Sequence, residues 1–494
     1  MLTTPSSTGH VTRRSFIRRW PWAAALLGLV VACGNGSAPV PSVQVSEGAK
    51  LANAGVGDVP DTVRAHAYLE SFYATSDILH SFNTVFGEEI DCIDFYAQPV
   101  VKEALARGDS VSPNGPPPGV GPELPSSTLP LPFDGQPDEN GHARRCPAGS
   151  VPAHRPTLQT IEVAGGLDAF LAYAAKVPSP SGAPGEQAQL DCFDNYTTGG
   201  VSYDHAAGYQ YQNYQGLLTF TPTYNPYVEV LNAEHSVSQL WAETGNCEYD
   251  TARPPSQNPC NSSDWVQSLE LGLDVGANPF SRGGGAQIPM LFTFVTLNGY
   301  YSENCWGMIQ GSYCGSNGGF VQVTGANYVP GSYMTYTGTG VAPIETALQV
   351  WNGSAYGYPY WFVYVNGNLI GYYYGSMYAG QMQSSASYLQ VGGEVFDSWP
   401  NNAHTNTLMG GGYVSGGWEF QGYDRHVSYI DSSNAYHNAS LGYVNSNTGI
   451  CGYEASSYYD LETNEAAGPL QTQWGSTFDT WNTYFYFGGN LWRQ

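Results

Sequence analysis

Tyr360-Trp-Phe-Val-Tyr-Val365 is followed by Asn366-Gly-Asn368 and then by Leu369-Ile-Gly-Tyr-Tyr373. Two aromatic, β-branched runs of strand length therefore flank an Asn-Gly pair, which favours the tight turn of a β-hairpin. Similar short runs recur without intervening helical patterns at residues 217–221, 268–275, 290–297, 320–323, 389–395 and 426–430. Many short strands without helices between them predict a mainly β protein, built as an antiparallel β-sandwich of the jelly-roll kind.

The composition agrees with this fold and excludes some partners. The 494 residues include 60 Gly, 37 Tyr and 12 Trp, and only 12% are charged, as expected for aromatic strands joined by glycine turns. The formal net charge of −25 repels nucleic acid and anionic membrane surfaces. We expect no nucleic-acid partner, and we expect a monomer.

The N-terminus carries an export signal. Thr12-Arg-Arg-Ser-Phe-Ile-Arg18 resembles a twin-arginine motif, and it precedes an apolar run at 23–31 that is too short to span a bilayer. Val31-Ala-Cys-Gly34 resembles a bacterial lipobox, so either Cys33 receives a lipid or the chain is simply cleaved nearby. The sequence predicts an exported protein, secreted or held at the cell envelope, whose only membrane attachment would be a lipid on Cys33.

Changes in composition and in the spacing of apolar residues divide the chain into four segments. They are a signal peptide at 1–32, a small-residue tether at 33–60, a mixed α/β region at 61–190 and a β-sandwich domain at 191–494. Within the third segment, apolar residues such as Leu69, Phe72, Ile78 and Phe82 recur at helical intervals, which predicts helix between 61 and 107.

Eight cysteines remain after Cys33, an even number that indicates disulfides in an exported chain. The spacings favour Cys247–Cys260 and Cys305–Cys314, then Cys92–Cys146, and leave Cys192–Cys451 by elimination. No paired C-x-x-C or histidine cluster is present, so we expect no metal site. We also expect no cofactor, because no phosphate-binding glycine motif occurs.

The common hydrolase motifs are missing, and two carboxylates stand out by context. In a predicted alternating strand, Glu270 shares one face with Ser268, Gly272 and Asp274. Glu394 follows two glycines. Most strand glutamates only decorate a solvent-facing surface, so residue pattern alone does not make these two catalytic.

A resemblance to a known family supports a catalytic role for Glu270 and Glu394. In the mixed region, Gly87-Glu-Glu-Ile-Asp-Cys-Ile-Asp94 and Cys146-Pro-Ala-Gly-Ser-Val-Pro152 resemble the activation peptide of the neprosin family of glutamic peptidases. Motifs of the predicted sandwich follow the family order: Ser238-Gln-Leu-Trp241, Ser268-Leu-Glu-Leu-Gly272, Gly319-Phe-Val-Gln322, Val391-Gly-Gly-Glu-Val395 and the run from His404 to Gly412.

The resemblance implies a β-sandwich endopeptidase whose catalytic glutamates fall on Glu270 and Glu394. Two carboxyls held close together share one proton, which gives an acid and a base on the acid side of neutrality. By similarity Glu394 would be the base, although the two roles are interchangeable on sequence alone. The resemblance also implies a peptide or protein substrate, cleavage after proline, and a zymogen whose 61–190 region covers the cleft; His404 would be a turn or support residue.

Other functions suit the same composition. A carbohydrate-binding module would use aromatic faces to stack sugars, and a glycosidase would also use two carboxylates. A catalytically dead adhesion protein is a third alternative.

Overall fold

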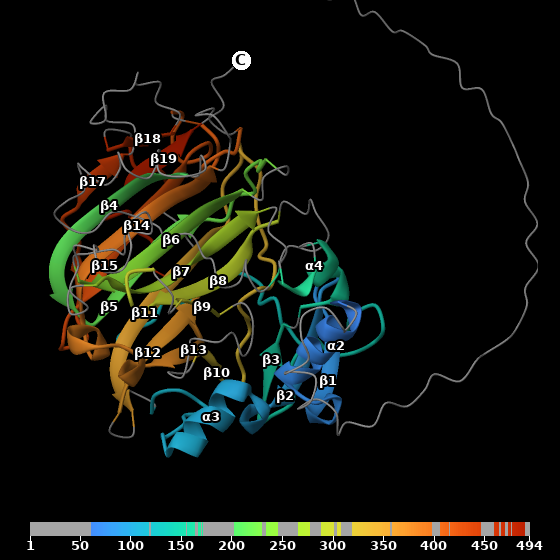
Figure 1. Ribbon diagram of the computed structural model, residues 1–494. Coiled ribbons are helices and arrows are strands. Elements are labelled where there is room, and N and C mark those ends of the chain that lie inside the picture. The colour runs from blue at the N-terminus through green and yellow to red at the C-terminus, as the bar shows by residue number, and fades with distance from the viewer. Residues whose placement is uncertain are drawn as a thin grey trace, which may run out of the picture. The chain divides into compact units, whose positions relative to one another are not determined.

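The structure is a computed structural model that describes most of residues 61–489 (Figure 1). The residues within that range that it does not describe are 118–119, 155, 164–165, 169, 171–201, 230–233, 246–264, 277–287, 301–303, 308–318, 356–357, 398–405, 414, 446–458, 464–465, 470–472 and 476. The expected signal peptide, Cys33 and tether lie outside the described residues. Among the helices that are described, none is long and apolar enough to cross a membrane.

The main domain is a sandwich of two antiparallel sheets, as predicted (Figure 1). The nine-stranded sheet contains, in spatial order, β10 (Val321–Gln322), β13 (Asn368–Tyr374), β12 (Tyr358–Val365), β11 (Glu345–Ala355), β5 (Gly216–Pro222), β15 (Gly422–Ile430), β19 (Phe485–Gly489) and β18 (Tyr459–Glu462), with β16 (Tyr436–Asn438) paired to β15. The seven-stranded sheet contains β17 (Gly442–Asn445), β4 (Ser202–Tyr214), β14 (Ala386–Asp397), β6 (His235–Thr244), β7 (Gln267–Gly276), β8 (Met290–Thr296) and β9 (Asn304–Trp306).

The hairpin expected from the Asn-Gly pair joins β12 to β13. Asn366 has φ 51° and Gly367 has φ 73°, the positive values that the tight hairpin turn requires at both central positions. Further short 3-10 helices follow or precede strands at Thr75–Asp77, Phe95–Ala97, Gly375–Met377 and Gly380–Gln383.

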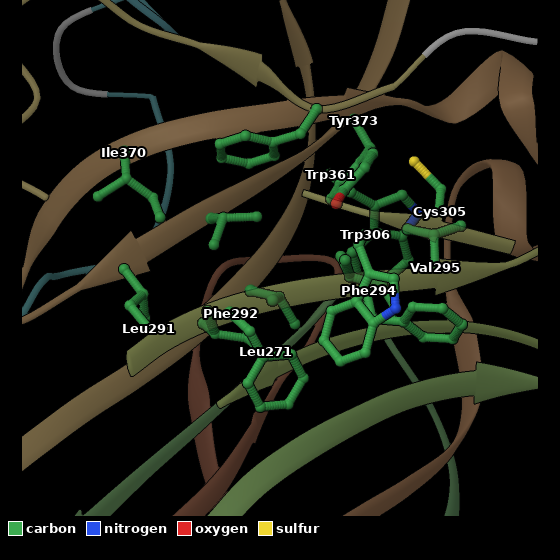
Figure 2. Close-up of a cluster of buried hydrophobic side chains, with 14 of the residues drawn as sticks. Leu271, Leu291, Phe292, Phe294, Val295, Cys305, Trp306, Trp361, Ile370 and Tyr373 are labelled. Atoms are coloured by element: carbon green, nitrogen blue, oxygen red, sulfur yellow. The ribbon is translucent and has the colours of Figure 1, made fainter. Parts of the chain in front are cut away.

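The core lies between the two sheets. Hydroxyl groups link them at two points, where Thr221 meets Ser238 at 2.6 Å and Thr293 meets Tyr373 at 2.8 Å. Figure 2 shows part of the apolar packing, to which the nine-stranded sheet gives Trp361, Ile370 and Tyr373 and the seven-stranded sheet gives Leu271, Leu291 and Val295. One face of the seven-stranded sheet is therefore committed to the core, and functional side chains on this sheet belong on its other face.

The region before the sandwich combines helices and strands, as expected. Its helices are α2 (Asp61–Phe72), α3 (Pro99–Arg107) and α4 (Leu158–Val163), and its three-stranded sheet contains β1 (Ile78–Asn83), β2 (Glu89–Asp94) and β3 (Ser150–Ala153).

The stretch 61–107, predicted to be the most helical, contains α2 and α3 at its ends and two strands between them. Residues from Ile78 onward form β1, in which Phe82 is buried while Leu79 is exposed. Pairing with β2 outweighs the weak helical spacing of the apolar residues.

This N-terminal region binds the outer face of the nine-stranded sheet. The Ser112 amide donates to the Tyr372 hydroxyl at 2.9 Å, and the Tyr360 hydroxyl donates to the Ser110 carbonyl at 3.1 Å. Tyr372 points to the face opposite that of Tyr373, which bonds the other sheet. These two contacts lie on the nine-stranded sheet, whereas the glutamates lie on the seven-stranded sheet; residues 171–190 lie outside the description, and the cover over the glutamates stays a prediction.

Side-chain amides fasten the same region to the sheet edge. Gln98 Nε2 donates to the Gln322 carbonyl at 3.1 Å, and the Gln322 amide donates to Gln98 Oε1 at 2.9 Å. The Gln98 side chain thereby makes the two hydrogen bonds with β10 that a neighbouring strand would make.

One predicted disulfide is confirmed and the others fall on residues that are not described. Cys92 on β2 bonds Cys146. Cys305 is also disulfide-bonded, but Cys314, its predicted partner, lies outside the described residues, as do Cys192, Cys247, Cys260 and Cys451.

Candidate active site

Glu270 and Glu394 lie on the same face of the seven-stranded sheet. Glu270 on β7 is opposite Trp241 on β6, and Trp241 is opposite Gln390 on β14. Residues at even intervals along a strand share a face, so Glu394, four residues after Gln390, points to the same side as Glu270. The two glutamates, predicted from separate motifs, come from strands separated only by β6.

This face is the one that turns away from the nine-stranded sheet. Ser238 and Thr293, which bond the other sheet, alternate with the residues of the glutamate face. Glu270 and Glu394 are nevertheless only 3% exposed each. A carboxyl removed from water in this way favours its neutral form unless donors or positive charge compensate it.

Two hydroxyl groups hold Glu270. The Ser268 hydroxyl donates to Glu270 Oε1 at 2.8 Å, and the Tyr300 hydroxyl donates to the same oxygen at 2.9 Å. Burial and the negative charge of Glu394 raise the pKa of Glu270 well above its usual range, and these effects outweigh the lowering by the two hydroxyls. Glu270 is therefore a carboxylic acid at acidic pH, with its second oxygen free of these two contacts.

Donors surround Glu394 instead. His205 Nε2 on β4 lies 2.9 Å from Glu394 Oε2, and Gln239 Nε2 on β6 donates to the same oxygen at 3.4 Å. An ionised carboxylate only accepts hydrogen bonds, so the His205 nitrogen carries the hydrogen when Glu394 is charged. Both contacts are made by Oε2, and Oε1 takes part in neither of them.

A third carboxyl, Glu243, lies on the same face. Glu243 on β6 is opposite Ser268 on β7. Ser268 lies two residues before Glu270, so it shares the face of Glu270. Burial raises the pKa of Glu243 to about 8, although His205 and a hydrogen bond with Tyr300 lower it. Tyr300 thus contacts both Glu270 and Glu243, and its own backbone has φ 64°, a left-handed conformation that is uncommon outside glycine.

The far end of the face carries one more acid. Asp274 on β7 lies 3.8 Å from His235 Nδ1 on β6, and both side chains are buried. Burial lowers the pKa of His235, but the nearby Asp274 carboxylate outweighs this effect and leaves that pKa raised. Among the described residues, no group of three acidic, histidine or cysteine side chains could hold a metal ion.

The glycines beside Glu394 serve packing within the protein. A Cβ atom on Gly393 would lie 2.6 Å from Phe487 and 2.8 Å from Met409, and one on Gly392 would lie 2.4 Å from the Ala206 carbonyl. Glycines beside a strand residue predict close approach of another backbone or of a substrate, and here they allow close contact with neighbouring strands.

Sequence reasoning found both glutamates but missed His205, Glu243 and the contact of Tyr300. Strand pairing brings His205 and Glu243 to the site, whereas Tyr300 lies in a turn after β8. A detectable signal was that Gln239, Trp241 and Glu243 are spaced two residues apart, as on one face of a strand. His404, the expected support residue, lies outside the described residues.

Comparison with known proteins identifies the family. The Neprosin family profile matches residues 232–490, more than half of the chain. The chain belongs to the neprosin family. A solved structure of scytalido-glutamic peptidase, with a peptide-based transition-state analogue, is also similar, at 6% sequence identity and a TM-score of 0.26, over 58% of this chain and 98% of that chain.

As a member of the neprosin family, the chain is a peptidase and hence a hydrolase that acts on peptides or proteins. This finding favours the peptidase over the carbohydrate-binding and glycosidase alternatives. The matched range contains Glu243, Glu270 and Glu394, whereas His205 on β4 and the whole N-terminal region lie before it.

Proposed function

We propose that this neprosin-family chain is a glutamic endopeptidase in which Glu270 and Glu394 together activate water. The observation that carries the proposal is the unequal environment of two carboxyls on one face. Glu270 has a raised pKa, and Glu394 accepts hydrogen bonds from Gln239 and from His205. Pairs of titratable groups whose environments differ in this way supply an acid and a base at the same pH.

In the proposed reaction, Glu394 removes a proton from water as the water oxygen attacks the carbonyl carbon of the substrate. The neutral Glu270 donates a hydrogen bond to the carbonyl oxygen, where negative charge develops. When the carbon–nitrogen bond breaks, the proton held by Glu394 passes to the leaving nitrogen. Ser268 and Tyr300 orient the acid, while His205 and Gln239 orient the base.

The active state needs one proton on the pair. As pH rises through the pKa of Glu270, that proton is lost and activity falls, which gives the alkaline limb of the profile. Protonation of Glu394 at low pH removes the base and gives the acid limb. We therefore expect a bell-shaped profile with its maximum on the acid side of neutrality.

We further propose that the chain is exported, that it is made as a zymogen, and that it cleaves after proline. Export is supported by the N-terminal signal pattern, and the zymogen by the 3% exposure of both glutamates in the full chain. Cleavage after proline is supported by the family resemblance. The described contacts of residues 61–170 run to the nine-stranded sheet and also from Glu88 to the Tyr333 amide, in a loop that pairs with β8 of the seven-stranded sheet.

The test is cleavage of a peptide library across pH by the full chain, before and after incubation at acidic pH. Glu270→Gln and Glu394→Gln should each lower kcat/KM by about 10²- to 10⁴-fold, because each keeps side-chain volume and removes a proton-transfer group. The library reports the preferred residue at the cleaved bond at the same time.

Asp424→Asn is the matched control. Asp424 is a buried carboxyl on β15 with its pKa raised by burial to about 8, and it accepts a hydrogen bond from Thr219 at 2.7 Å. It lies on the nine-stranded sheet, so this substitution should leave kcat/KM near that of the wild type. Undiminished cleavage by either glutamate variant would refute the two-carboxyl mechanism.

A further inference from the structure

Two buried N–H groups lie side by side on the glutamate face. Trp241 on β6 is opposite Gln390 on β14 and, on its other side, opposite Glu270 on β7. Trp241 Nε1 and Gln390 Nε2 are buried and have no hydrogen-bond partner within the described part of the chain. A buried N–H group without an acceptor lowers stability. These two N–H groups lie next to each other and in register with Glu270, the proposed acid, so they indicate a place where acceptors of another molecule bind.

The neighbouring side chains fix both donors. The Tyr388 hydroxyl donates to Gln390 Oε1 at 2.9 Å, so the amide is oriented and its NH₂ group is the free end. The Trp241 ring lies 6.3 Å from the His205 ring, across β14. Gly392 has no side chain on the strand between them, which leaves room for the indole near both glutamates.

Three tyrosines lie beside this pair of donors on the same face of the sheet. Tyr209 is opposite Gln390, and Tyr211 is opposite Tyr388, so all three rings share the glutamate face. The Tyr211 and Tyr388 rings are 5.0 Å apart, and Tyr209 lies 5.9 Å from Tyr388. Tyr211 is 52% exposed, so this end of the row is accessible.

Building on the proposed peptidase function, we propose that this row is a substrate subsite. Trp241 Nε1 and Gln390 Nε2 donate to backbone carbonyl oxygens of an extended peptide, and the tyrosine cluster (Tyr209, Tyr211 and Tyr388) binds an apolar ring side chain of the same peptide. Carbonyl oxygens are the acceptors that every peptide offers, and aromatic faces add contact area for a ring.

The spacing of the strands sets which substrate residue is recognised. Adjacent strands lie about 4.8 Å apart, so the three spacings from β7 to β4 amount to about 14 Å. An extended peptide advances about 3.3 Å per residue, so the ring bound by the tyrosine cluster belongs to a residue about four positions from the cleaved bond. The subsite therefore predicts selectivity well away from the scissile bond.

Gln390→Met tests the donor, and Gln349→Met is its control. Gln349 matches Gln390 closely: it is equally buried, its Oε1 accepts from the Tyr436 hydroxyl at 3.2 Å, and its Nε2 has no partner in the described structure. It lies on β11 of the nine-stranded sheet, far in topology from the glutamates. Each substitution removes an unpaired buried donor and also the acceptor of a tyrosine hydroxyl, so the two should change the melting temperature by similar amounts.

Only Gln390→Met should raise KM, by about three- to tenfold with little change in kcat, because the lost hydrogen bond acts in substrate binding. An unchanged KM, or an equal rise in the Gln349→Met control, would refute the donor assignment.

The second test is Tyr211→Ser, assayed with peptides that carry Phe, Ala or Asp at the distant position. The wild type should prefer Phe, and the variant should lose that preference; equal preference in both proteins would refute the ring site.

Binding measurements separate this inference from the proposed chemistry. Peptide affinity can be measured by calorimetry in the Glu270→Gln background, where no turnover is expected. If Gln390→Met weakens peptide binding, the subsite is supported even if the wild type cleaves nothing. Absence of cleavage by the wild type would refute only the two-glutamate mechanism. Binding that Gln390→Met leaves unchanged would refute the subsite even if cleavage depended on both glutamates.

Discussion

Two clusters of buried carboxyl groups, one on each sheet of the sandwich, have opposite surroundings. On the nine-stranded sheet, Glu345 is fully buried against Arg425, whose Nε and Nη2 atoms each lie 2.6 Å from the carboxylate. Tyr423 and Trp474 donate to the same carboxylate at 2.8 Å each. On the seven-stranded sheet, Glu270, Glu394 and Glu243 share one face, and no described arginine or lysine forms an ion pair with any of them.

The difference separates a structural use of charge from a chemical one. A buried carboxylate with four donors has its charge matched by fixed groups and orders its surroundings. On the other sheet burial raises the pKa of Glu270 and of Glu243, which suits them to proton exchange with a substrate.

The largest expected effect comes from breaking the satisfied cluster. Arg425→Met should lower the free energy of unfolding by about 3–5 kcal/mol, because it leaves Glu345 buried without its counter-ion. Glu394→Gln, which removes charge from the other sheet, should change stability far less. Urea unfolding of both variants checks this contrast, and equal losses would show that the two sheets do not differ as described.

A smaller effect is expected at His205. His205→Leu removes one of the two donors on Glu394 and should lower kcat/KM by about 10- to 100-fold, as for a hydrogen bond to a charged group. It should also move the acid limb of the pH profile to higher pH, because the carboxylate form loses support. His205→Gln can retain a donor, so it should recover part of the activity; equal activity of the two variants would argue against a positioning role.

The smallest effect concerns pH and Glu243. Its raised pKa of about 8 means that the folded state keeps a proton that the unfolded state releases above its own lower pKa. Glu243 therefore destabilises the fold progressively as pH rises from about 4.5 to about 8. Glu243→Gln should gain about 1–3 kcal/mol over the wild type at pH 8 and little at pH 5. Urea unfolding at both values measures this, and a gain independent of pH would contradict the neutral state of Glu243.

Local sequence predicted some of these features because short-range physics decides them. The Asn366-Gly367 turn needs two positive φ angles, which these residues adopt easily, and it fixes the β12–β13 hairpin. The helix expected beyond Ile78 failed because apolar spacing alone cannot weigh a helix against pairing with β2. The Cys92–Cys146 bond was an open choice among pairings until β2 was placed.

By itself, the sequence determined a β-sandwich, an alternating strand around Glu270 and, through its family motifs, the pair Glu270 and Glu394. The tertiary structure alone decided that β4, β14, β6 and β7 are neighbours in that order. Alternation along a strand is encoded locally and gives each side chain its face, but the choice of neighbouring strand depends on packing of the whole domain. For that reason His205, Glu243 and the Trp241–Gln390 donor pair became recognisable only in the assembled sheet.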